Sequence, residues 1–180
     1  VPVLVADREV IAEVVGFDLH RGVLASARRR PLPSVANLAA GATRLAVLDG
    51  LNDAENLGAI ARAARAFGVD GLVIDPTCTD PYSRRTVRVS MGEVLLLPVA
   101  RADAPTWREL PTLLHGAGIE LWAMTPSRDA DDLWSLPTDA RVAVAFGAEG
   151  PGLDAATLRA ADRRVRIPIA PEVDSLNVGQ

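Results

Sequence analysis

The sequence lacks lysine, has a single cysteine and contains no long run of apolar residues. All 19 of its basic residues are arginine. With Cys78 alone, no disulfide can form within the chain, which favours a reducing compartment, and we predict a cytoplasmic protein. The simplest interpretation of Cys78 is a small buried hydrophobic side chain. No apolar run approaches the roughly 20 residues of a membrane-spanning helix and no signal peptide is evident, so we expect no membrane partner.

Three short motifs of well-known chemistry are also missing. The chain has no GxxxxGK[ST] phosphate loop, no GxGxxG dinucleotide fingerprint and no GxSxG nucleophile elbow. A nucleotide-dependent α/β enzyme is therefore disfavoured. Both histidines lie far upstream of Ser175, so we do not expect this serine to be a hydrolase nucleophile. His20 has no second His or Cys at metal-ligand spacing, so we interpret it as a turn or packing residue and expect no metal site.

Size and composition indicate one domain or slightly more. The chain has 180 residues, of which 49% are hydrophobic, and this is ample for a core. The net charge of −4 argues weakly against a general polyanion binder. The arginines nevertheless cluster at residues 28–30, at 84, 85 and 88, and at 163, 164 and 166. Arginine suits bidentate phosphate contacts, so a locally basic face is an open possibility.

The chain divides into two parts joined by a proline-containing stretch. Residues 1–27 read as a strand over 1–5, a helix from Asp7 to Val15 ended by Gly16, and a strand over 22–27. Residues 28–41 are the predicted linker, and residues 42–180 form the main domain. The first residue is not methionine and the chain opens in mid-element, so we expect a piece of a longer parent protein.

The main domain opens with a βαβ unit. Residues 44–49 and 72–74 are apolar strands, and a helix over about 56–67 joins them, with Gly68 as its C′ residue. Such a unit predicts a parallel sheet. The apolar stripe of the helix comprises Leu57, Ile60, Ala61, Ala64 and Phe67. Asn56 is interpreted as the N-cap, and the ordinary fate of Arg62 is a solvated helix charge.

The remaining elements continue the alternation of strands and helices, which fits an α/β fold. We predict a short helix carrying Arg84, Arg85 and Arg88, a strand over 94–99, a helix over 106–115 and a strand over 119–124. After a polar loop at 126–137 we predict a central strand over 141–146, a helix over 153–161 and a strand over 163–169.

Two further segments exceed what folding alone requires. Residues 146–153 (FGAEGPGL) link a strand to a helix through three glycines, which let backbone amides approach a ligand closely. Glu149 would repel a phosphate and suits a cationic or hydroxyl-bearing ligand better. A tight turn is an equally good explanation of this loop. At residues 166–178 an apolar strand leads to a polar turn, where Ser175 or Asp174 could cap a helix.

Together, three segments resemble the SpoU (TrmH-like) branch of the SPOUT RNA methyltransferases. The first family motif, roughly D-x-x-N-x-G-x-x-x-R, is matched by Asp53, Asn56, Gly58 and Arg62. The second resembles residues 146–153 and the third resembles residues 167–178 (IPIAPEVDSLNV), in the family order. Residues 1–27 are similar to the end of the small RNA-binding domain that precedes the catalytic domain in many members.

The resemblance implies a parallel-sheet α/β knot (SPOUT) domain preceded by a remnant of a small α+β RNA-binding domain. It implies a homodimeric enzyme that transfers a methyl group from S-adenosylmethionine to a ribose 2′-hydroxyl of RNA, with rRNA favoured over tRNA. The implied catalytic residues are Arg62, Asn56, Ser175, Asn177 and Glu149. The implied cofactor-binding residues are Gly147, Ile167, Leu176, Phe146, Ala148, Gly150 and Ile169.

Two features leave alternatives open. The family continues past the position of residue 180 into a helix at the knot and dimer interface, so we expect cofactor binding and dimerisation to depend on that helix. A non-catalytic RNA-binding or assembly factor of the same fold is the alternative function, and a tRNA-directed enzyme is another. The role of Arg62 is also open between a general base and an orienting group, because a guanidinium stays protonated far above neutral pH.

Overall fold

The computed structural model describes residues 2–20, 22–170 and 172–179. These residues form two compact units, residues 1–31 and residues 32–180. The boundary falls inside the predicted linker. Each unit is described by itself below.

The described residues of the first unit form one helix, α1 (Arg8–Val15). Its predicted limits are confirmed, because Asp7 is the N-cap residue and Gly16 ends the helix with φ 75°. The predicted strands over 1–5 and 22–27 are wrong for the described residues 2–5 and 22–27, which have no strand partner. A strand needs a neighbour for its backbone groups, and residues 2–20 and 22–31 provide none for either segment. The unit also buries little, since no residue of α1 is buried and Val3, Leu4 and Val5 are exposed.

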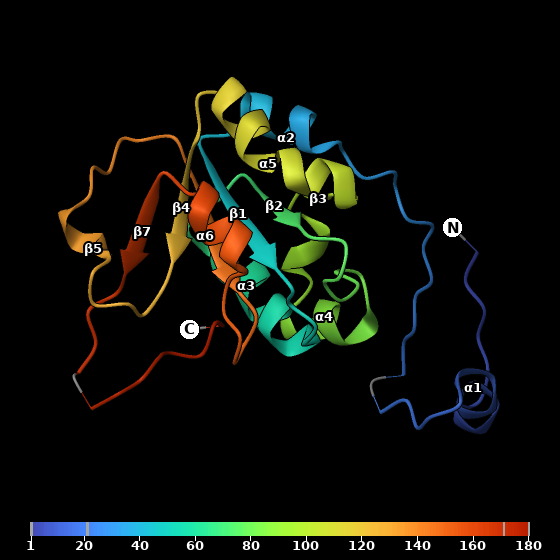
Figure 1. The fold of residues 1–180 in the computed structure, drawn as a ribbon. Coiled ribbons are helices and arrows are strands. Elements are labelled where there is room, and N and C mark those ends of the chain that lie inside the picture. Colours follow the sequence, from blue (N-terminus) through green and yellow to red (C-terminus); the bar gives the residue numbers. More distant parts are fainter. Residues whose placement is uncertain (1, 21, 171, 180) are drawn as a thin grey trace. The chain divides into compact units, whose positions relative to one another are not determined.

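The described part of the second unit forms a parallel sheet of seven strands in the order β3-β2-β1-β6-β4-β7-β5 (Figure 1). The strands are β1 (Arg44–Asp49), β2 (Gly71–Ile74), β3 (Val99–Arg101), β4 (Glu120–Met124), β5 (Asp131–Asp132), β6 (Val142–Gly147) and β7 (Arg163–Arg166). Every pairing is parallel. The predicted α/β class and the central place of the strand near 141–146 are confirmed.

Helices cover both faces of this sheet. One face packs against α2 (Val35–Gly41), α5 (Ala104–Gly116) and α6 (Ala155–Ala160), in a core that includes Leu45, Val47 and Leu114. The other face packs against α3 (Ala54–Ala66) and the one-turn helix η1 (Glu93–Leu95), around Leu48, Leu57 and Ile74. Helix α4 (Arg84–Val89) packs against α3, and its Val87 also packs against this core. A second one-turn helix, η2 (Leu133–Ser135), contributes Leu133 to a small cluster around Trp122 and Val165.

The predicted linker over 28–41 is wrong in its second half. Residues 35–41 form α2, which Ser34 caps by accepting a hydrogen bond from the Asn37 backbone N–H at 3.1 Å. Val35 and Ala39 of this helix are buried in the sheet core. Pro31 and Pro33 signalled a loop, but proline also commonly precedes a helix, and the helix begins immediately after the capping serine.

Other predicted limits also need correction. The strand expected over 94–99 is η1 followed by the shorter β3, because Val94 and Leu97 fill the α3 side of the core without a ladder. The expected strand over 163–169 ends at Arg166. The loop over 126–137 contains β5 and η2. Phe67 is 79% exposed and is not part of the α3 stripe, whereas Leu57, Ile60, Ala61 and Ala64 are buried as predicted.

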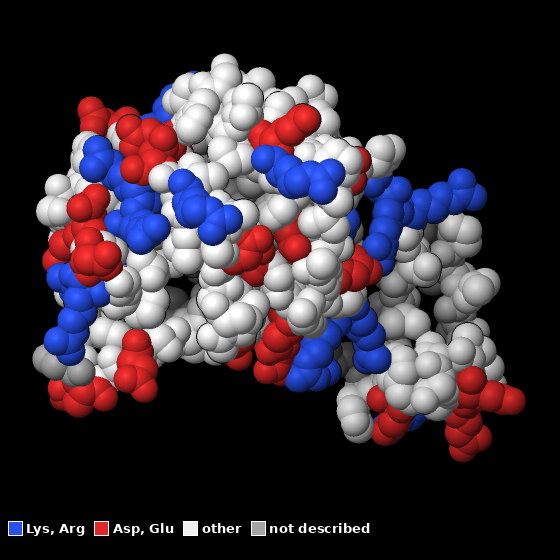
Figure 2. Space-filling model, in the orientation of Figure 1, with Lys and Arg blue, Asp and Glu red and all other residues white. Residues whose placement is uncertain are grey.

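Basic and acidic side chains lie beside one another over the visible face of the molecule (Figure 2). Arg163 lies near Glu120 and Asp131, at 3.5 and 3.6 Å. The cluster at 163–166 is therefore partly neutralised by its neighbours. Of the helices that the described residues form, none has the length and apolar character needed to cross a bilayer.

Candidate functional site

The carboxyl ends of β1 and β6 meet at the middle of the sheet. Asp49, the last residue of β1, pairs with Gly147, the last residue of β6. The chain leaves these strands through the loops 50–53 and 148–153, and a Cβ added to Gly50 would lie 3.7 Å from the Cβ of Ala148. In open α/β sheets ligands bind beyond the carboxyl ends of the strands, where the strand order reverses, as it does between β1 and β6.

The glycine loop 147–152 folds back tightly on itself. The Gly152 backbone N–H donates to the Ala148 carbonyl at 2.9 Å. A Cβ on Gly147 would lie 2.1 Å from both the Gly152 carbonyl carbon and the Leu153 nitrogen, so no side chain fits there. Gly150 and Gly152 adopt φ of 87° and 71°, which only glycine adopts readily. The three glycines are thus required by the turn itself.

Asp49 fastens this loop to β1. Its carboxylate accepts hydrogen bonds from the Thr157 hydroxyl at 2.9 Å and from the Asp154 backbone N–H at 3.2 Å. Burial raises the pKa of Asp49 above its ordinary value, although these two hydrogen bonds oppose the shift. Sequence reasoning missed this residue. The available signal was an acidic side chain ending an otherwise apolar strand.

A second network fixes the loop after β1. The Cys78 thiol donates to the Leu48 carbonyl and accepts from the Leu51 backbone N–H, each at 3.3 Å. Burial, reinforced by a hydrogen bond to Asp75, raises the pKa of Cys78 to about 12, so the thiol stays protonated. The interpretation of Cys78 as a buried hydrophobic residue is confirmed, since it is 6% exposed.

Arg101 at the end of β3 holds the loop that carries Cys78. Its guanidinium donates to four backbone carbonyls, those of Asp75, Pro76, Cys78 and Thr79, at 3.0–3.2 Å. One planar group with several fixed donors suits such a cluster of carbonyls. Arg101 therefore positions the loop that in turn positions residues 50–53.

The start of α3 brings Asn56 to the site, but not as a cap. Asp53 is the N-cap and accepts from the Glu55 backbone N–H at 2.8 Å. Asn56 lies inside the helix and is 8% exposed, so the predicted capping role is wrong. A Cβ on Gly179 would lie 3.2 Å from the Cβ of Ala59 and 3.4 Å from the Asn56 Oδ1, which places the C-terminal segment against this part of α3.

The C-terminal segment also reaches the glycine loop. The Asn177 side-chain amide donates to the Glu149 carboxylate, and the Gly179 backbone N–H donates to the Asn177 Oδ1 at 2.7 Å. Val178 packs on the same core cluster as Phe146. Three of the predicted site residues, Asn56, Glu149 and Asn177, are thus gathered from three distant segments.

The other predicted site residues lie around this group at greater exposure. Ser175 is exposed, and no helix starts beside it in residues 172–179, so the predicted cap at Ser175 or Asp174 is not formed. Ile167 and Leu176 are 39% and 49% exposed. Ile169, Phe146 and Ala148 are half-buried, and Gly150 lies exposed in the glycine loop.

Arg62 lies apart from the three gathered residues. It is exposed on α3 and lines a shallow hollow of about 310 Å³ with Arg65, Ala66 and Glu93. Arg62 lies six positions after Asn56, which is a net rotation of about 240° around an α-helix, so the two side chains leave different sides of α3.

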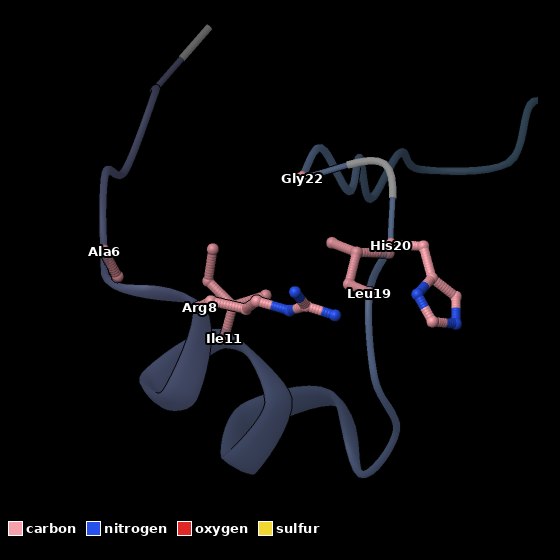
Figure 3. Close-up of a pocket in the computed structure, with 6 residues that line it drawn as sticks. All are labelled: Ala6, Arg8, Ile11, Leu19, His20 and Gly22. Carbon is pink, nitrogen blue, oxygen red and sulfur yellow. The ribbon is translucent and has the colours of Figure 1, made fainter.

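The first unit has a small hollow of its own, of about 230 Å³ (Figure 3). Arg8 reaches from α1 toward Leu19 and binds the Asp18 carboxylate at 2.8 Å, while the ring of His20 points away from the helix. His20 lies in a turn, as one of its two predicted roles required, and its side chain is 81% exposed and 3.5 Å from Asp18, so it does not pack in a core. Among the described residues, no three His, Cys, Asp or Glu side chains are placed to hold a metal ion.

Comparison with known proteins gives a consistent result. Residues 43–180 match the model of the SpoU rRNA Methylase family. An uncharacterized tRNA/rRNA methyltransferase of Mycobacterium tuberculosis is 54% identical over 177 residues, which is 96% of this chain and 60% of the relative. The 23S rRNA (guanosine-2'-O-)-methyltransferase RlmB of Ralstonia nicotianae is 31% identical over 180 residues, 96% of this chain and 70% of the relative.

A solved structure shows the same fold. The crystal structure of an AdoMet-bound rRNA methyltransferase from Sinorhizobium meliloti aligns with a TM-score of 0.75 at 30% identity, covering 83% of this chain and 57% of that chain. The chain thus spans 60% of the length of the mycobacterial relative.

Proposed function

The chain belongs to the SpoU rRNA Methylase family, and from this premise we propose that it transfers a methyl group from S-adenosylmethionine to a ribose 2′-hydroxyl of RNA. The observation that carries the proposal is the convergence of Asn56, Glu149 and Asn177. Each comes from a different one of the three matched segments. Their meeting at the carboxyl ends of β1 and β6 puts amide and carboxylate groups where α/β sheets bind ligands.

The residues present fit S-adenosylmethionine in their chemistry. The glycine loop offers exposed backbone, because Gly150 and Gly152 carry no side chain and both are exposed. Ile167 and Leu176 are apolar and partly exposed, as the lining of an adenine slot would be before its ligand binds. We propose that Gly147, Ile167 and Leu176 hold the cofactor largely through backbone groups, with Phe146, Ala148, Gly150 and Ile169 around them. When bound, the cofactor supplies the activated methyl group.

The protein's own part in the reaction is alignment and charge stabilisation. A ribose 2′-hydroxyl is a poor nucleophile until its proton is drawn away, so its position and its hydrogen bonds matter. Asn177 is held by Glu149, and we propose that it aligns this hydroxyl together with Ser175 and Asn56. Because a guanidinium stays protonated, Arg62 serves as an orienting group that stabilises negative charge on the ribose or an adjacent phosphate.

We further propose ribosomal RNA as the substrate, a homodimer as the working form and the cytoplasm as its location. Similarity to a relative named as a 23S rRNA methyltransferase supports the choice of rRNA over tRNA. We propose that residues 1–27 end a small RNA-binding domain and that the segment after β7 completes a knot. Arg62 lies on a different side of α3 from the gathered residues, which is compatible with a second subunit or RNA completing its surroundings.

The test begins with calorimetric titration of this chain with S-adenosylmethionine and S-adenosylhomocysteine, followed by transfer of a radiolabelled methyl group to ribosomal RNA. We expect the same titration of a chain extended past Gln180 to give binding in the micromolar range, and we expect that longer chain to label ribose 2′-oxygens. The Arg62→Ala variant should bind the cofactor like the wild type and lose methyl transfer. Cofactor binding without transfer to any RNA would favour a non-catalytic RNA-binding factor, and unchanged transfer by the variant would remove Arg62 from the mechanism.

A further inference from the structure

Helices α3 and α4 lie side by side (Figure 1), and we call the charged residues of these two helices and of η1 the α3–α4 seam. At its first end Arg85 of α4 forms an ion pair with Glu55 of α3, the residue next to Asn56. At its other end Arg65 of α3 lies 3.6 Å from Glu93 of η1. In between, a Cβ on Gly58 would lie within 3.0 Å of both Val89 and the Thr86 carbonyl, so the two helices touch there.

Two further arginines of this seam have no partner in the part of the chain that the structure describes. Arg62 and Arg88 are exposed, and neither makes a side-chain hydrogen bond or ion pair with any described residue. The seam therefore holds five arginines, at positions 62, 65, 84, 85 and 88, against the two glutamates 55 and 93. It carries an excess of three positive charges on a chain whose net charge is −4.

We propose that this α3–α4 seam binds the sugar–phosphate backbone of the RNA substrate, with Arg62 and Arg88 each contacting a phosphate. The proposal rests on the function proposed above and identifies a surface through which the RNA is held. Arginine fits phosphate because its planar guanidinium donates two parallel hydrogen bonds. The seam begins one residue from Asn56, so RNA bound along α3 passes the group of Asn56, Glu149 and Asn177.

The two ion pairs set how many phosphates the seam can hold. Glu55 and Glu93 occupy Arg85 and Arg65, and they also position these side chains. Both pairs are partly exposed, so neutralising Glu93 releases the Arg65 guanidinium without uncovering a buried charge. A variant that removes a glutamate should therefore gain RNA affinity, which a damaged fold would not produce.

The size of the effect is set by counterion release. For single-stranded RNA each neutralised phosphate contributes a slope of about −0.7 to a plot of log K against log salt concentration. At about 0.1 M salt one contact is then worth about 0.7 log units, or roughly a fivefold change in affinity. Losing the Arg88 contact should lower affinity about fivefold and reduce the slope by about 0.7. Losing the contact should not change the affinity extrapolated to 1 M salt.

The experiment measures binding of a fluorescein-labelled single-stranded oligouridine by fluorescence anisotropy over a series of salt concentrations. This probe is suitable because phosphate contacts do not depend on base sequence. The variants are Arg88→Ala, Glu93→Gln and the control Arg108→Ala. Arg108 is exposed on α5, which covers the opposite face of the sheet, and its removal changes the net charge equally.

We expect Arg88→Ala to weaken binding about fivefold, Glu93→Gln to strengthen it up to about fivefold, and Arg108→Ala to change it little. Equal effects of Arg88→Ala and Arg108→Ala would overturn the proposal, as would wild-type binding that does not depend on salt. So would a change of oligomeric state in Arg88→Ala by sedimentation, because the seam would then be a contact between copies.

Methyl transfer and cofactor titration separate this proposal from the function on which it rests. If the wild type binds S-adenosylmethionine and methylates RNA while Arg88→Ala binds oligouridine normally, only the seam proposal fails. If the chain neither binds the cofactor nor transfers a methyl group but the oligouridine results hold, the seam is an RNA-binding surface and the proposed reaction fails.

Discussion

Replacing Gly58 by alanine should destabilise the protein although alanine is the better helix former. Gly58 lies inside α3 where α4 crosses it. A Cβ at this position would lie 2.8 Å from the Val89 Cβ, 2.9 Å from its Cγ1 and 3.0 Å from the Thr86 carbonyl oxygen. Optimal carbon–carbon contacts are about 3.5–4.0 Å, so the new methyl group would intrude by up to about 1 Å.

Two opposing contributions set the change in the free energy of unfolding. Alanine in place of glycine should stabilise a helix interior by about 1 kcal/mol. Overpacking typically costs about 1–3 kcal/mol, and we take the upper half of that range here. A rotamer change of Val89 moves its Cγ1, but it moves neither its Cβ nor the backbone carbonyl of Thr86. The net loss should be about 1–2 kcal/mol, which lowers Tm by roughly 2–8 °C for a protein of this size.

The assay is urea unfolding followed by circular dichroism, with Gly116→Ala as the matched control. Gly116 is the last residue of α5, and a Cβ there would meet nothing within 4 Å. Alanine at 116 should therefore leave the free energy of unfolding unchanged or raise it by up to about 1 kcal/mol. A Gly58→Ala protein as stable as the wild type would show that α4 can shift away from α3 without cost. The explanation of Gly58 by close helix packing would then be wrong.

Three further predictions concern the loops at the carboxyl ends of the strands. Gly147→Ala should abolish S-adenosylmethionine binding in calorimetry, because the added Cβ would lie 2.1 Å from loop backbone; retained affinity would contradict this. Asp49→Asn should remove a pH dependence: burial raises the folded-state pKa of Asp49, so its contribution to stability is present below pH 3.8 and is lost as pH rises through the raised pKa. The measurement is the free energy of unfolding of the wild type and of Asp49→Asn between pH 3.8 and the raised pKa. Identical pH dependence of the two proteins would contradict the prediction. Arg101→Ala should speed the labelling of Cys78 by a thiol reagent, because it removes four hydrogen bonds from the loop that buries this cysteine; wild-type labelling kinetics in the variant would count against the role of Arg101.

The sequence predicts the elements of the sheet well where burial is continuous. The strand at 44–49 and the helix after it have apolar patterns long enough to locate them, and Gly68 marks the helix end with φ 69°. The sequence predicts secondary structure poorly where an apolar run is too short to distinguish a strand from a single helical turn. Residues 94–97 are apolar like a strand, yet η1 covers residues 93–95, and only Val94 and Leu97 of this run are buried while Leu95 and Leu96 are exposed.

The site could be predicted from the sequence only through its matched segments. Asn56 and Asn177 could be predicted because they belong to motifs. Their proximity in space depends on the order of the strands in the sheet, which no local sequence pattern specifies. The roles of Asp49 and Arg101 could not be predicted, because each side chain binds backbone or hydroxyl groups that are distant in the sequence. Phe67 was misplaced because a helical stripe gives the direction of a side chain but not whether a neighbour covers it.

The position of β6 between β1 and β4 has a consequence for how the protein is made. Residues 44–49 are synthesised long before residues 142–147, at a translation rate of about 5–20 residues per second. For roughly 5 to 20 seconds the nascent β1 has its partner β2 on one side and an open hydrogen-bonding edge on the other. Open edges of apolar strands template aggregation, so this edge is a site of self-association until β6 emerges. Chains released before residue 142 are expected to self-associate through it.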